Sequence, residues 1–138
     1  MRTGNRASAV IIKDGQILLI HRKKDGHEYW VFPGGGVEDY ETPEETMVRE
    51  IKEETNQTIL SFKPLFNEAF EVNGNGLRHN YFYSCQIDGA ELLLTGEEAS
   101  KQSEHDWYNP EWVELSEFPA LEVLPERAKD KILAILKQ

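Results

Sequence analysis

The chain has 138 residues, with 25 acidic and 15 basic side chains and a formal net charge of −10. A surface of this sign repels nucleic-acid polymers and anionic lipid at long range, so we expect neither as a partner. The first residues are polar, and no apolar run approaches the ~20 residues of a membrane span, which predicts neither a signal peptide nor membrane insertion.

This length fits one domain, and the sequence contains no repeat and no low-complexity linker, so we expect a single domain over residues 1–138. Cys85 is the single cysteine, which excludes an intrachain disulfide and favours a cytoplasmic location. Because Cys85 lies in a run of apolar and aromatic residues, we expect a buried small hydrophobe rather than a nucleophile.

The first predicted elements are strands over residues 7–13 and 16–22, joined by a tight turn at Asp14–Gly15. A short strand is predicted over residues 29–32, and we expect no regular structure in the following Pro33–Gly36. Further strands are predicted over residues 59–72, 77–87, 91–94 and 111–115.

A helix is predicted over residues 43–55, because Thr42 can cap its first turn, Pro43 suits the first position and Glu45 completes a capping box. Pro125 is predicted to open a last helix. Its buried stripe is expected to hold Ile132, Leu133, Ile135 and Leu136. Strands with one internal and one C-terminal helix predict an α/β fold, an α/β/α sandwich on a mixed sheet.

The internal helix has two predicted faces. The face expected to contact the sheet holds Met47, Val48, Ile51 and Thr55, and the other holds Glu50, Glu53 and Glu54. The spacing of three and four predicts that these carboxylates converge, although like charges repel there and the helix C-terminus disfavours them. Arg49 can relieve the repulsion by pairing with Glu45 or Glu53.

Two interpretations of this acidic face stay open on the helix alone. It is either a solvated face or a site for a hard cation with oxygen ligands, Mg²⁺ or Mn²⁺. The preceding glycine run, Gly34 to Gly36, favours the cation, because a backbone without side chains can approach a metal or ligand closely.

The spacing between this glycine run and the acidic helix is specific. It resembles the Nudix box, G-x5-E-x7-R-E-U-x-E-E-x-G-U, where U is a bulky aliphatic residue. The matching positions are Gly35, Glu41, Arg49, Glu50, Ile51, Glu53 and Glu54. Two positions depart from the pattern. Asn56 replaces glycine, a mild change because asparagine tolerates the left-handed conformation, and Gln57 replaces an aliphatic residue.

The resemblance implies a Nudix fold and a metal-dependent hydrolase that cleaves a diphosphate linkage in a nucleotide by water attack on phosphorus. It implies that Glu50, Glu53, Glu54 and the Gly35 carbonyl bind Mg²⁺, with Mn²⁺ as a substitute. It also implies that Arg49 and Glu41 orient the helix carboxylates, and we expect Glu53 to act as the general base.

Other candidates lie outside the helix. Some Nudix members take the base from a later loop, which here offers Glu97, Glu98 and Glu104, and we favour Glu98 as an additional ligand or base. Arg22, in the basic stretch 21–24, is expected either to contact phosphates or to lie in a solvated turn, and Gly34 and Gly36 are expected to contact substrate. Five aromatic residues either stack on a base or pack in the core: Trp30, Phe32, Tyr81, Tyr83 and Trp107.

Markers of the ADP-ribose, dinucleoside polyphosphate, coenzyme A and NADH branches are absent from the sequence. The chain therefore resembles the MutT-like branch, which implies a nucleoside triphosphate or related diphosphate as substrate. Two alternatives remain: a Nudix-fold domain that binds nucleotide without cleaving it, and an unrelated acidic interaction module. The oligomeric state stays open, a homodimer included.

Overall fold

The computed structural model describes residues 2–71, 74, 76–93 and 105–137. The first of its two sheets has the strand order β5 (Gly34–Glu38), β1 (Arg2–Val10), β7 (Leu77–Ile87), β6 (Ile59–Glu71). Strands β1 and β7 run parallel, whereas β5 and β6 run antiparallel to their neighbours, so the sheet is mixed.

The second sheet is built around β3 (Gln16–Lys24), which pairs with β2 (Ile12–Lys13), β4 (His27–Val31) and β8 (Asp106–Glu114). The short strand β9 (Val123–Leu124) adds to β4 in parallel, so this sheet is mixed as well. The predicted turn at Asp14–Gly15 is confirmed, and the same dipeptide at Asp25–Gly26 forms a second turn that the sequence reading overlooked.

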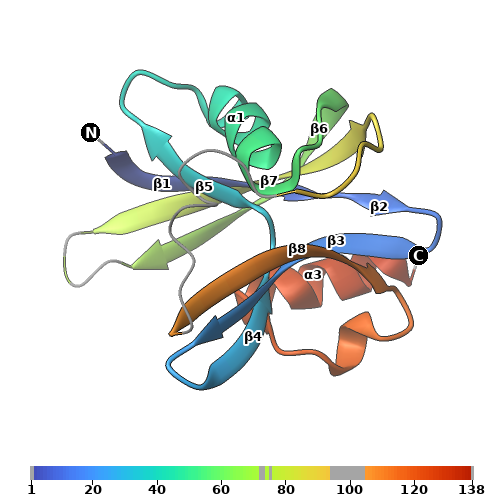
Figure 1. The fold of residues 1–138 in the computed structure, drawn as a ribbon. Helices are drawn as coiled ribbons and strands as arrows, with labels where there is room; N and C mark the ends of the chain where they lie inside the picture. The colour runs from blue at the N-terminus through green and yellow to red at the C-terminus, as the bar shows by residue number, and fades with distance from the viewer. Residues whose placement is uncertain (1, 72–73, 75, 94–104, 138) are drawn as a thin grey trace.

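Helices α1 (Pro43–Thr55) and α3 (Glu126–Leu136) lie on opposite faces of the first sheet, as Figure 1 shows. Met47 and Ile51 of α1 pack on one face, and Ile132 of α3 packs on the other with Phe82. Phe118, in the 3₁₀ turn Phe118–Ala120, packs into the same core as Ile132 and Phe82. The predicted α/β fold with mixed sheets and two helices is confirmed.

Three strand predictions need correction. The segment 7–13 is not one strand, because β1 begins at Arg2 and the chain crosses from the first sheet to the second at Ile11. The last predicted strands differ too: residues 91–93 form none, and the strand expected at 111–115 is the end of the longer β8.

The glycine run is a strand, not the irregular segment that was expected. Strand β5 pairs antiparallel with β1, and Gly35 lies opposite Ala7. At Gly34, where φ is +155°, a side-chain carbon would lie 2.2 Å from the Ala7 carbonyl oxygen. Glycine therefore permits this close pairing, and the strand signal is hidden because glycine is a poor strand former.

The helix-face predictions are partly wrong. Met47, Ile51 and Thr55 are fully buried, but Val48 is exposed at the edge of the stripe. In α3, Ile132 is buried and Leu133 packs partly against the core. The other two members of the predicted stripe, Ile135 and Leu136, are exposed in the last turn.

Cys85 is buried, as expected, and burial raises the pKa of its thiol to about 12. None of the helices in the described part of the chain has the length and apolar character that a membrane crossing requires.

Candidate active site

The start and end of α1 follow the predicted capping chemistry. The Thr42 hydroxyl accepts from the Glu45 backbone N–H at 3.1 Å, and the Glu45 carboxylate accepts from the Thr42 N–H at 2.9 Å. At the other end, Asn56 adopts the left-handed conformation with φ of 67°. The replacement of the family's glycine by asparagine is therefore accommodated without losing the helix end.

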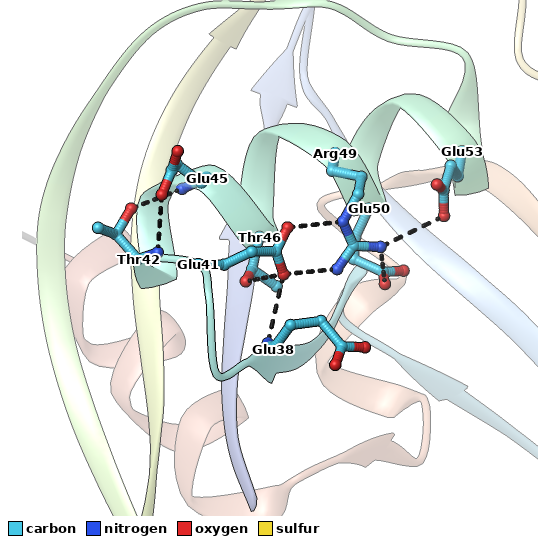
Figure 2. A network of polar contacts seen from close by, with 8 residues as sticks. All are labelled: Glu38, Glu41, Thr42, Glu45, Thr46, Arg49, Glu50 and Glu53. Atoms are coloured by element: carbon cyan, nitrogen blue, oxygen red, sulfur yellow. Dashed lines mark hydrogen bonds and ion pairs between the residues drawn. The ribbon is translucent and has the colours of Figure 1, made fainter. Parts of the chain in front are cut away.

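Glu41 is held in the turn before α1 by a two-pronged contact with Arg49. The Arg49 Nε and Nη2 atoms donate to the two oxygens of Glu41, each at 2.8 Å (Figure 2). The same carboxylate accepts from the Thr46 hydroxyl at 2.9 Å and from the Glu38 backbone N–H at 3.3 Å. Paired donors of this kind are among the strongest protein hydrogen bonds, so Glu41 fixes the direction of the Arg49 side chain.

These contacts lower the pKa of Glu41 to about 2, chiefly through the hydrogen bonds from Arg49. The hydrogen bond to Glu41 likewise raises the pKa of Arg49 above its usual value. Both groups are therefore fully charged at neutral pH, and the pair keeps its geometry there.

Arg49, held in place by Glu41, also contacts two carboxylates of the helix, those of Glu50 and Glu53. Its Nη1 atom donates to Glu50 at 2.8 Å and lies 3.6 Å from a Glu53 oxygen (Figure 2). Glu50 is buried against the glycine strand, where a side-chain carbon at Gly35 would lie 2.4 Å from its carboxyl carbon. The side chain of Glu53 is 39% exposed and can meet solvent.

Glu54 turns the other way and joins the helix to the glycine strand. One of its oxygens accepts from the Gly34 backbone N–H at 2.8 Å. Glu54 and Gly34 both line a cavity of about 250 Å³, together with Arg22 and Asp106. This cavity places one helix carboxylate beside an arginine from the second sheet.

The predicted convergence of Glu50, Glu53 and Glu54 is not observed. In the described part of the chain, no three acidic, histidine or cysteine side chains are grouped closely enough to hold one metal ion. In this structure Arg49 contacts Glu50 and Glu53, whereas the Gly34 N–H contacts Glu54.

The donor chemistry nevertheless fits a hard divalent cation. Carboxylate oxygens and a backbone carbonyl are the ligands that Mg²⁺ prefers, and the absence of a side chain at Gly35 leaves the strand backbone open to Glu50. Of the predicted ligands, Glu98 lies outside the described residues, as do Glu97 and Glu104.

Arg22 is half-buried between the two sheets rather than in a solvated turn. Its Nη2 atom donates to Asp106 at 2.8 Å, and its guanidinium lies 5.4 Å from the centre of the Tyr108 ring. Its Nε atom is buried without a hydrogen-bond partner among the described residues. Arg22 lines the same small cavity as Glu54.

A second, larger cavity of about 930 Å³ continues from the first and shares four lining residues with it: Arg6, Arg22, Val31 and Phe32. The sequence reading missed its polar residues Ser8, Glu68 and Asn80. The sequence offers only a weak signal for these residues, which is that each is a polar residue at a strand position that faces the interior.

Most of the aromatic candidates have packing roles. Phe32 and Tyr83 are buried, and Trp30 and Tyr81 pack partly against the two cores. Trp107 meets His21 edge-on. Of these five aromatic candidates, Phe32 alone lines either of these two cavities in the described structure.

Gln57, the second departure from the box, is fully buried after α1. Its amide nitrogen donates to the Ala90 carbonyl at 2.5 Å and to the Thr55 carbonyl at 3.4 Å. Its amide oxygen has no hydrogen-bond partner among the described residues. At the position where the family pattern has an aliphatic residue, Gln57 thus binds the backbone carbonyls of Thr55 and Ala90 instead.

Comparison with known families matches the NUDIX domain to residues 3–134. The chain belongs to the Nudix family. The matched segment contains the capped helix, the Glu41–Arg49 pair and the glycine strand, so the motif resemblance and the fold agree.

Relatives of this Nudix chain carry different names. A Caenorhabditis elegans protein with a provisional nudix hydrolase name is 36% identical over 108 residues, which are 75% of this chain and 28% of that protein. An ADP-ribose pyrophosphatase of Methanocaldococcus jannaschii is 55% identical over 47 residues, 33% of this chain and 28% of the relative. The chain thus spans less than a third of the length of these curated relatives.

Among solved structures, a MutT protein from Methanosarcina mazei superposes with a TM-score of 0.72 at 22% identity, covering 96% of this chain and 91% of that one. The likeness establishes the fold, and MutT proteins are among the structural neighbours of this chain.

Proposed function

We propose that the protein is a divalent-metal-dependent pyrophosphohydrolase that acts on a nucleoside triphosphate or a related nucleoside diphosphate derivative, in the manner of the MutT-like branch. The observation that carries the proposal is the position of Glu54. It binds the glycine strand and lines the small cavity that continues into a space large enough for a nucleotide. Drug-sized ligands occupy clefts of about 300–1,000 Å³.

In this proposal the metal ligands are Glu50, Glu53, Glu54, the Gly35 carbonyl and Glu98. Bound Mg²⁺ would neutralise phosphate charge and lower the pKa of the attacking water. Because each carboxylate already contacts Arg49 or the Gly34 N–H, holding a cation requires these side chains to rotate toward one another. Arg49 is itself held by Glu41, and its contacts with Glu50 and Glu53 restrict the directions in which these two carboxylates can turn.

Glu53 is the proposed general base. Its carboxylate is the most exposed of those that Arg49 contacts, so a water can reach it. The water oxygen forms a bond to phosphorus as the bridging P–O bond breaks, and the water proton passes to the Glu53 carboxylate. The leaving phosphate takes the bridging oxygen, so that a nucleoside monophosphate and a phosphate or diphosphate are released.

The remaining contacts to the phosphates come from the walls of the small cavity. Arg22 and Gly34 line this cavity, and we place Gly36, two residues further along β5, beside the same phosphates. If the Arg22 guanidinium exchanges Asp106 for a phosphate, its positive charge still has a negative partner. The planar guanidinium can donate two parallel hydrogen bonds to a phosphate. A small nucleotide is therefore the partner that we propose.

The test is hydrolysis of a panel of ribonucleoside and deoxyribonucleoside triphosphates and ADP-ribose, with Mg²⁺ or with EDTA. We expect turnover with Mg²⁺ that EDTA abolishes. The Glu53→Gln variant is expected to lose about 10²–10⁴-fold in kcat, the usual contribution of a general base. Glu117→Gln is the matched control, because Glu117 is exposed and makes no side-chain cap bond. Full activity in Glu53→Gln would remove Glu53 as base.

A further inference from the structure

The large cavity lies on the face of the first sheet that α1 does not cover. Its floor includes Ser8 of β1, Asn80 of β7 and Glu68 of β6, and its far wall includes Leu124 and Arg127 beside the start of α3. This cavity is the part of the site for which neither the box nor the helix suggested a role.

Four residues form one row across the first sheet. In strand order, Gly36 of β5 pairs with Arg6 of β1, Arg6 with Asn80 of β7, and Asn80 with Glu68 of β6. Neighbouring strands are about 4.8 Å apart, so the row extends roughly 14 Å from the glycine strand. It therefore begins beside the proposed phosphate site and ends in the large cavity.

The two residues at the far end are buried polar groups. Asn80 is 5% exposed and Glu68 is 8% exposed, and both line the cavity. Because they are direct partners across an antiparallel pair, their side chains project side by side from the same face of the sheet. Burying such groups costs free energy unless they find hydrogen-bond partners.

Their contacts inside the protein leave hydrogen-bonding capacity. The Ser8 hydroxyl donates to the Asn80 Oδ1 atom at 2.8 Å, and the Asn80 amide nitrogen has no hydrogen-bond partner among the described residues. Lys131 of α3 lies 2.6 Å from the Glu68 Oε1 atom. A carboxylate accepts several hydrogen bonds, so Glu68 can accept further donors beside the Asn80 amide.

We propose that Asn80 and Glu68 together read the nucleobase and so determine which nucleotide the enzyme prefers. The pair presents one amide donor next to one carboxylate acceptor, which complements a base edge with an acceptor next to a donor. This inference rests on the proposed function, because it places the phosphates at the α1 end of the row and the base at the other.

The surrounding walls suit a flat heteroaromatic ring. Val31, Phe32, Phe70 and Leu124 supply apolar surface around the polar pair. Apolar walls with a few placed polar groups are typical of specific small-molecule sites. A site built to hydrogen-bond a ligand discriminates strongly against one that leaves its buried groups unpaired.

The experiment compares base preference in wild type and in Glu68→Gln and Asn80→Asp. Substrates are the four ribonucleoside triphosphates and inorganic tripolyphosphate, which has no base. We expect each variant to change the ratio of kcat/KM between the best and worst base by about tenfold or more, with the effect in KM, while tripolyphosphate turnover stays the same. Glu71→Gln is the control, since Glu71 is exposed on the same strand and lines the same cavity.

Binding of nucleoside monophosphates, measured by calorimetry, separates this inference from the proposed function. A wild type that binds them with a base preference altered in both variants, but turns over no substrate, supports the inference and ends the proposed function. Turnover with an unchanged ranking of bases in both variants overturns the inference. An equal loss on every substrate, tripolyphosphate included, shows a structural role and overturns it as well.

Discussion

The two ends of the site are built in different ways. The polar network around Arg49 joins residues at most eight positions apart along a capped helix and the turn before it. The row of Gly36, Arg6, Asn80 and Glu68 takes its members from four strands, and the Ser8 hydroxyl that binds Asn80 is 72 positions away from it in sequence. A local network is set by helix geometry, whereas the row exists only because two sheets and a helix enclose it.

This difference predicts that the two ends can be damaged separately. Variants in the Arg49 network should change the rate for every substrate, and variants in the row should change the choice among substrates.

Among the variants that compare the two ends, the largest effect is expected from Arg49→Lys. Lysine keeps the charge but cannot make the two-pronged contact with Glu41 while also contacting Glu50, so the carboxylates lose their fixed direction. Misplacement by about 1 Å can cost about 10²-fold in rate, and we expect a loss of kcat of that order. Steady-state kinetics on the triphosphate panel checks it, with Arg78→Lys as control, and an altered ranking of bases would show that the two ends are coupled.

Gly35→Ala is expected to disturb the packing of the helix on the glycine strand. The new methyl carbon would lie 2.4 Å from the carboxyl carbon of the buried Glu50, closer than van der Waals contact allows, and overpacking of this kind costs about 1–3 kcal/mol. Urea denaturation measures the change in the free energy of unfolding. Adding Glu50→Asp shortens the opposing side chain and should recover part of the loss; no recovery would mean that the strain lies elsewhere.

Glu41 predicts an acid-sensitive contribution to stability. Its pKa is lowered from 4.5 to about 2 in the folded protein, so its stabilisation is fully present above pH 4.5 and is lost as the pH falls through 2. Glu41→Gln lacks this contribution, so the stability difference from wild type should shrink between pH 4.5 and pH 2. Denaturation at a series of pH values tests it, and a constant difference would contradict the assignment.

The smallest effect is expected from Thr42→Ala, which removes the hydroxyl that caps α1. Loss of an N-cap of this type costs about 1 kcal/mol, and it should leave the base preference unchanged. Thermal or urea denaturation measures it against Thr58→Ala, an exposed threonine outside the helix. Equal stability of the two variants would show that the capping box contributes little.

The sequence predicted the parts of the fold that depend on local chemistry. The limits of α1, its capping box, the left-handed Asn56 and the first hairpin turn all follow from residues that are close along the chain. Predictions that needed a partner surface were weaker. Val48, Ile135 and Leu136 match the apolar pattern but are exposed among the residues that the structure describes.

The sequence by itself determined the family, the charged helix and the identity of its acidic residues, because fixed spacings and helix periodicity are properties of short segments. Only the tertiary structure decided that the glycine run is a strand, that Arg49 contacts Glu50 and Glu53 whereas Gly34 contacts Glu54, and that Asn80 lies beside Glu68 in a cavity. The physical reason is that strand register and cavity shape arise from contacts between distant segments, which no local pattern encodes.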